Sequence, residues 1–220
     1  MYHIIVIDYQ NDFCSPGGKW FKERPAQTFI EKTLIPFLKE NDIKISEIIS
    51  DYRLPRQNET IDYCVPGTWG YQSAIPSDVK KKDVWIKAMN SPDWVRENGG
   101  NANSRPALPY PDPHAFSQWL EKNIGKPNPD DQIVLIGLTL DCCVLCTSQQ
   151  LYFRGYKVKI LKEGTDVYDV TAAKKMLKEG SDYQAFLFGT THGMFSTAIN
   201  WDDLSKSLMN QASHRLRAKI

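Results

Sequence analysis

Three polar residues that are far apart in the chain stand where catalytic groups are expected. Asp8 and Lys87 each end an apolar stretch, and Cys143 follows a third such stretch after a short turn. A cysteine at the start of a helix meets free backbone N–H groups and the positive end of the helix dipole, which favour the thiolate. A nearby Lys87 would lower the thiol pKa further, and Asp8 could take the thiol proton and deliver it to a leaving group. The residue types predict a cysteine nucleophile with an acid–base partner.

The turn before Cys143 also offers donors for a negatively charged intermediate. The backbone N–H groups of Thr139 and Cys143 are expected to form an oxyanion hole, where one donor contributes about 3–4 kcal/mol in known cases. The plainer interpretation is that Cys143 is a small buried apolar residue, as most free cysteines are. Because Asp8 and Lys87 at strand ends could both act on the thiol, we favour the interpretation of Cys143 as a nucleophile.

The elements that must position these residues alternate between strands and helices. Strands are expected at residues 3–8, 45–50, 83–87, 132–137, 157–162 and 184–188. Helices are expected at residues 27–40, 114–123, 142–153, 171–179 and from 201 to about 208. This alternation predicts a three-layer α/β/α fold, in which helices cover both faces of a six-stranded, mostly parallel sheet. With the strand order 3-2-1-4-5-6, Asp8 and Cys143 would face each other where the order reverses, which is where such sheets bind ligands.

Composition narrows the function classes. The 220 residues suit a single domain spanning 1–220, and the net charge of +1 gives no argument for nucleic-acid binding. No apolar run approaches the ~20 residues of a membrane span, and the N-terminus lacks a signal-peptide pattern. Five cysteines, three of them within residues 142–146, make a poor disulfide framework. A cytoplasmic protein that acts on a small molecule is expected, without membrane or nucleic-acid partners.

Several motifs resemble those of one known family. Residues 136–144 (IGLTLDCCV) resemble the nucleophile loop of the isochorismatase-like cysteine hydrolases, the superfamily of nicotinamidase and N-carbamoylsarcosine amidase. Residues 6–14 (VIDYQNDFC), 85–87 (WIK) and 154–158 (RGYKV) resemble its first-strand motif, its lysine strand and its next helix–strand junction, in the family's order.

The resemblance implies roles for the three polar residues and a setting for them. It implies Asp8 as the base, Lys87 as the activating cation and Cys143 as the nucleophile. It also implies a cis peptide before Thr139, a six-stranded parallel sheet, and assembly into dimers or tetramers. No cofactor is expected.

One part of the family pattern is missing. Nicotinamidases carry an Asp-x-His and a further His that bind a metal, whereas this chain has Asp51-Tyr52-Arg53 and then Tyr63 at the corresponding positions. A lone Asp51 cannot hold a divalent ion tightly. We therefore expect no catalytic metal, and nicotinamidase activity is not favoured. Arg53 is interpreted either as a bidentate ligand of a substrate carboxylate or carbonyl, or as a solvated surface residue.

Two long irregular stretches, residues 52–80 and 89–113, are expected to shape the pocket. The loop 89–113 is either a lid or an interface element. Substrate contacts are expected from side chains in or near the predicted pocket, namely Phe13, Arg53, Tyr63, Trp69 and Trp94.

Other interpretations of the motifs compete. Cys143 and Cys146 form a C-x-x-C that suggests thiol redox chemistry, but this leaves Asp8 and Lys87 unexplained. A zinc site at Cys142, Cys143 and Cys146 lacks a fourth ligand. His192 is assigned to structure or to an oligomer contact.

The predicted function is hydrolysis of a C–N bond in a small amide or ureido-type substrate through a thioester. Two alternatives remain open at this stage. One is vinyl-ether hydrolysis of the isochorismatase type, which uses the aspartate without the thiol. The other is a catalytically silent member of the family that binds a small ligand.

Overall fold

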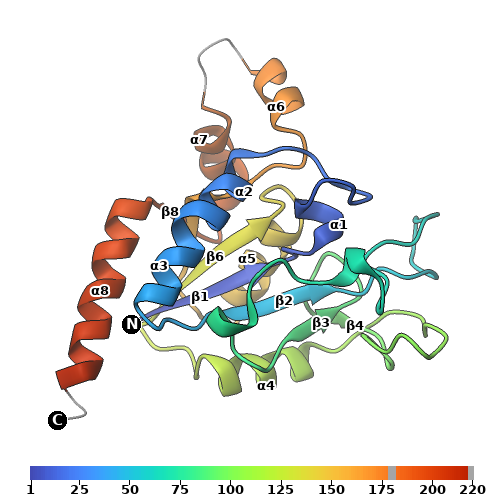
Figure 1. Cartoon of the computed structure of the whole chain (residues 1–220), viewed down its shortest axis with the longest axis horizontal. Coiled ribbons are helices and arrows are strands. Elements are labelled where there is room, and N and C mark those ends of the chain that lie inside the picture. The colour runs from blue at the N-terminus through green and yellow to red at the C-terminus, as the bar shows by residue number, and fades with distance from the viewer. Residues whose placement is uncertain (178–181, 218–220) are drawn as a thin grey trace.

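The centre of the molecule is a six-stranded parallel sheet in the order β3-β2-β1-β6-β7-β8 (Figure 1). The computed structural model describes residues 1–177 and 182–217. The strands of the sheet are β1 (Tyr2–Ile7), β2 (Ser46–Ser50), β3 (Trp85–Lys87), β6 (Gln132–Leu138), β7 (Val158–Asp166) and β8 (Thr197–Ile199). This order reverses between β1 and β6, which confirms the predicted fold class.

Side-chain alternation along the inner strands divides the core into two layers. Strand β1 runs between β2 and β6 and is apolar throughout its buried part, as expected for a strand that is covered on both faces. Successive side chains point to opposite faces, so Ile4 and Val6 pack in one layer and Ile5 and Ile7 in the other.

Helices cover both layers, on opposite sides of the sheet (Figure 1). The layer of Ile4 and Val6 is covered by α2 (Pro25–Phe29), the π-helical η1 (Ile30–Leu34), α3 (Ile35–Glu40) and α8 (Trp201–Arg217). The layer of Ile5 and Ile7 is covered by α4 (Pro113–Asn123) and α5 (Cys143–Phe153). No helix in the two described ranges is long and apolar enough to cross a bilayer.

The predicted strand at 184–188 was wrong, because this segment is helical. It forms α7 (Tyr183–Leu187), which continues into the π-helical η4 (Phe188–His192), and β8 supplies the sixth strand instead. The Asp182 side chain accepts hydrogen bonds from the backbone N–H groups of Gln184 and Ala185, and this N-cap starts a helix. A short apolar run fits a strand or a helix equally well by composition, and here the cap favours the helix.

The C-terminal helices also differ from the expected boundaries. Helix α8 extends to Arg217, well beyond the predicted end near residue 208. The helix expected at 171–179 is α6 (Val170–Met176), and its predicted last residues, 178 and 179, lie outside the described residues.

The loops beyond the carboxyl ends of the strands contain short elements of their own (Figure 1). The one-turn helix α1 (Asn11–Cys14) follows β1, and residues 52–80 include the 3₁₀ helices η2 (Trp69–Tyr71) and η3 (Ser77–Val79). Residues 89–113 form an antiparallel pair of β4 (Trp94–Val95) and β5 (Tyr110–Pro111). The ion pair of Asp93 with Arg154, 2.7 Å long, connects this pair to the end of α5.

Candidate active site

A buried ion pair lies at the carboxyl ends of three neighbouring strands. Asp8 follows β1 directly, Ser50 ends β2, and Lys87 ends β3 in register with Ser50. Asp8 has a φ of 51°, in the left-handed region that Asp tolerates better than most residues. The Lys87 Nζ lies 2.8 Å from Asp8 Oδ2, and neither side chain is reached by solvent.

The ammonium group of Lys87 is the hub of this cluster. It donates to Ser50 Oγ at 2.8 Å, to the hydroxyl of Tyr52, and to Cys143 Sγ at 3.5 Å. Asp8 Oδ2, 2.8 Å from the same ammonium, forms a close ion pair with it. Ser50 Oγ in turn donates to Asp8 Oδ1 at 2.7 Å. One lysine thus connects a carboxylate to a thiol.

Cys143 enters this cluster from the opposite side of the strand-order reversal. It is the first residue of α5, and its side chain is almost fully buried. Its Sγ lies 3.5 Å from the hydroxyl of Tyr52 and 3.9 Å from Asn90 Oδ1. Asp8, Lys87 and Cys143, which the sequence analysis singled out, are therefore brought together around one ammonium group.

The surroundings favour the neutral thiol of Cys143 in the free protein. A hydrogen bond with Cys142, and then burial, raise the pKa of Cys143 well above its ordinary value, against the opposing charge of Lys87. The sequence analysis expected a lowered pKa, but that reasoning omitted the Cys142 thiol and the burial. Burial acts to lower the pKa of Lys87, yet the negative charge of Asp8 outweighs it and the pKa is raised. Lys87 stays cationic beside a protonated thiol.

The loop between β6 and α5 presents two backbone donors. The peptide bond between Leu138 and Thr139 is cis. In the described part of the chain, the N–H groups of Thr139 and Cys143 have no hydrogen-bond acceptor, whereas the carbonyl of Thr139 accepts from Cys142 and Val144. Donors without an internal partner are what an oxyanion hole requires.

Two contacts from neighbouring elements hold this loop in place. The N–H of Leu140 donates to the carbonyl of Asp166, at the end of β7. The carbonyl of Leu140 is 2.7 Å from Nε2 of the buried His192. His192, assigned in the sequence analysis to structure or oligomer contact, is thus a support of the nucleophile loop.

An aromatic cluster lies against the ammonium group of Lys87. The rings of Phe13, Tyr52 and Tyr63 meet edge to face, with centroid distances of 5.0 to 6.4 Å. Trp69 and Trp94 are 48% and 37% exposed, and among the described residues their rings do not pack against those of Phe13, Tyr52 or Tyr63. Of the aromatic residues expected from sequence as substrate contacts, Phe13 and Tyr63 pack against Tyr52 beside Lys87, and the carbonyl of Trp94 accepts from the N–H of Ala88 next to Lys87.

A hollow of about 610 Å³ opens at the other end of the strands. It is lined by Tyr2, His3 and Ile4 of β1, by residues 40–44, and by side chains within residues 208–213 of α8. Ligands of parallel sheets bind beyond the carboxyl ends of the strands, where Asp8, Lys87 and Cys143 are found. We therefore assign the candidate active site to the cluster around Lys87.

Comparison with solved structures identifies the fold. The nicotinamidase/pyrazinamidase of Bacillus subtilis superimposes with a TM-score of 0.58 at 16% identity, covering 90% of this chain and 99% of that one. The N-carbamoylsarcosine amidase of Thermoplasma acidophilum gives 0.54 at 14% identity, covering 90% and 95%. An isochorismatase-like hydrolase of Alkaliphilus metalliredigens gives 0.56 at 19%, covering 94% and 98%. The chain has the isochorismatase-like hydrolase fold. No protein-family model and no curated protein sequence matches it.

Within this isochorismatase-like fold, the residues around Asp51 do not fit a metal. The guanidinium of Arg53 binds Asp51 through both oxygens, with Nε to Oδ1 at 2.9 Å and Nη2 to Oδ2 at 2.6 Å. Asp51 Oδ2 also accepts from the N–H of Gly100. Among the residues described, no three His, Cys, Asp or Glu side chains are grouped as metal ligands. A fixed cation, Arg53, already neutralises the carboxylate of Asp51.

Arg53 itself has no donor left for a substrate. Its remaining N–H groups donate to the backbone carbonyls of Asn98, Asn101 and Ser104. A guanidinium has five N–H donors, and all five are engaged within the chain. Arg53 therefore holds the loop 98–104 against Asp51, and it is neither a solvated residue nor open to a ligand.

Sequence reasoning missed three residues of the cluster, namely Ser50, Tyr52 and Asn90. Ser50 ended a predicted strand, so a polar residue beside Asp8 in the sheet was a signal that could have found it. Tyr52 and Asn90 lie outside the strands of the sheet, in irregular segments. Such segments have no sequence period from which the direction of a side chain could be predicted.

Proposed function

We propose that this chain hydrolyses a C–N bond in a small amide or ureido-type substrate, with Cys143 as the nucleophile. The observation that carries the proposal is the shared ammonium group of Lys87, 2.8 Å from the Asp8 carboxylate and 3.5 Å from the Cys143 sulfur. A thiol, a carboxylate and a fixed cation at the mouth of a parallel sheet are the parts that acyl transfer to sulfur requires.

The first half-reaction starts from the neutral thiol. As the sulfur attacks the substrate carbonyl carbon, the proton of Cys143 passes to Asp8, and the charge of Lys87 stabilises the thiolate that develops. The N–H groups of Thr139 and Cys143 stabilise the oxyanion. Collapse of this intermediate breaks the C–N bond, and Asp8 returns the proton to the departing nitrogen. The product is an acyl thioester on Cys143.

The second half-reaction regenerates the enzyme. Asp8, again a carboxylate, removes a proton from water, which attacks the thioester carbonyl. The C–S bond breaks, the acid leaves, and the proton on Asp8 returns to the sulfur. Lys87 and Ser50 hold the Asp8 carboxylate in place for these transfers.

Ammonia release from a panel of small amides and ureas tests the proposal. The wild type should release ammonia, Cys143→Ala should lose activity by at least about 10³-fold, and Cys146→Ala is the matched control because Cys146 is one helical turn away. Quenched samples should carry the acyl mass on Cys143. If Cys143→Ala kept most of its rate of ammonia release, the thiol would not be the nucleophile and the thioester mechanism would be wrong.

A further inference from the structure

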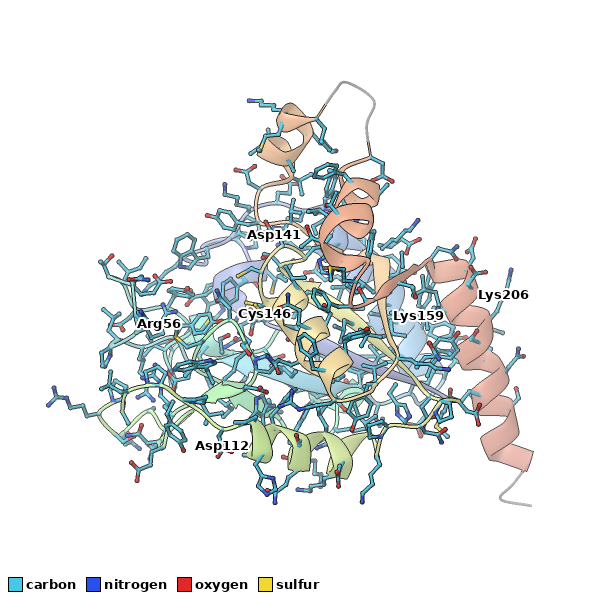
Figure 2. The ribbon with its side chains drawn as sticks, turned by 180° about the vertical axis from the view of Figure 1, so that it is seen from behind. Arg56, Asp112, Asp141, Cys146, Lys159 and Lys206 are labelled. Carbon is cyan, nitrogen blue, oxygen red and sulfur yellow. The ribbon has the colours of Figure 1, made fainter. Side chains whose placement is uncertain are left out.

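A second arginine near the cluster differs from Arg53, because part of its guanidinium is left without a partner. Arg56 is only 6% exposed, and its Nε and Nη2 are buried and hydrogen-bonded to nothing in the described chain. Its one ion pair joins Nη1 to Glu59 at 3.7 Å. Figure 2 shows Arg56 among the loops beyond the carboxyl ends of the strands, which is the edge that carries the catalytic cluster.

Arg56 is one aromatic side chain away from the nucleophile. Its Cζ lies 4.4 Å from the centroid of the Tyr52 ring and 4.7 Å from that of Tyr63. The hydroxyl of the same Tyr52 is 3.5 Å from Cys143 Sγ. Stacking on two rings holds the guanidinium plane without using its N–H donors.

The two unpartnered atoms of the Arg56 guanidinium, Nε and Nη2, indicate which kind of group would bind there. Nε and Nη2 form the side of a guanidinium that binds the two oxygens of a carboxylate in parallel. Arg53 uses this same pair of atoms to bind the Asp51 carboxylate. Donors that are buried without an acceptor are costly, and in the described residues Glu59 pairs with Nη1 while Nε and Nη2 have no acceptor.

We propose that the free edge of Arg56 binds a carboxylate of the substrate, so that the preferred substrates are small amides or ureas that carry a carboxylate group. The inference rests on the proposed function, and it gives to Arg56 the recognition that was one of the two interpretations of Arg53 from sequence.

The test compares each acid with its neutral ester. Ammonia release from succinamate and glutaramate is compared with release from their methyl esters. The proteins assayed are the wild type, Arg56→Gln and Arg56→Lys. Arg105→Gln is the control, because it removes one positive charge at an exposed site. The wild type should prefer an acid over its ester, and Arg56→Gln should lower that ratio of kcat/KM by about 10- to 100-fold. Arg56→Lys keeps the positive charge but lacks the two parallel N–H donors of the guanidinium, so it should lose most of the preference for the acid over its ester. Arg105→Gln should leave the ratio unchanged.

A second readout separates this inference from the hydrolase proposal. The same compounds are tested as protectants of Cys143 against iodoacetamide, with the modified residue identified by peptide mass spectrometry. Better protection by the acids, lost in Arg56→Gln, would support the carboxylate site even if no compound were hydrolysed, in which case the hydrolase proposal alone would fail. Measurable turnover that is equal for acid and ester, or equal protection by the two, in the wild type would overturn the role of Arg56.

Discussion

The Lys87 ammonium lies 2.8 Å from the Asp8 carboxylate, and both side chains are excluded from solvent. A buried pair of this kind contributes little net stability as a pair, because desolvation offsets the attraction between its charges. Removing only one partner destabilises the fold, because the other partner is then an uncompensated buried charge. Catalysis and folding are therefore coupled through the same two side chains.

We expect Lys87→Met to destabilise the protein by about 3–5 kcal/mol as well as to abolish turnover, because Asp8 is left unpaired. The double variant Lys87→Met/Asp8→Asn should recover most of the stability and none of the activity. Urea denaturation followed by circular dichroism measures both effects. A Lys87→Met protein as stable as the wild type would show that folding does not depend on the pairing of Asp8 with Lys87.

The pH dependence of the free thiol provides a second test. Because the pKa of Cys143 is raised, its reaction with iodoacetamide should keep increasing with pH above pH 9 and show no plateau near neutrality. Cys142→Ala removes the hydrogen bond that raises this pKa most, so the rate profile should shift to lower pH. Lys87→Met removes a charge that lowers the pKa and should shift the profile to higher pH. A plateau below pH 7 in the wild type would contradict this assignment.

Tyr52 is predicted to position the nucleophile through its hydroxyl, which contacts both Lys87 and Cys143. Tyr52→Phe keeps the ring packing and should lower kcat by about 10- to 100-fold, the range expected for losing a hydrogen bond to a charged group. The iodoacetamide profile of Cys143 should shift as well, whereas a purely structural role would leave it unmoved. Tyr110→Phe, at an exposed site, is the control.

Arg53 is predicted to matter for loop order and not for metal binding. Arg53→Met leaves the buried Asp51 unpaired and removes three donors to the carbonyls of residues 98–104, so a loss of about 3–5 kcal/mol is expected. Hydrogen exchange should accelerate at residues 98–104, and added Zn²⁺ should not restore stability. Unchanged exchange in this loop would show that Asp51 and Arg53 do not hold it.

Much of the architecture could be predicted because it depends on local sequence. The apolar runs of β1 and β6 must be buried on both faces, and alternation of strands with helices then requires a parallel sheet with a strand-order reversal. Asp8 and Lys87 follow from this, since residues that end parallel strands meet at one edge. The wrong strand at 184–188 had a local cause too: the Asp182 cap was overlooked in favour of the apolar run.

What only the tertiary structure decided is which polar groups already have partners. Arg53 and Arg56 lie three positions apart in one irregular stretch and are indistinguishable by residue type. Asp51 and the loop 98–104 use every donor of Arg53, while Arg56 stacks on two rings with one edge free. In the same way, the pKa of Cys143 depends on Cys142, burial and Lys87 together. Hydrogen bonds and ion pairs form only between groups a few ångströms apart in space. An irregular loop has no sequence periodicity from which such proximity could be predicted.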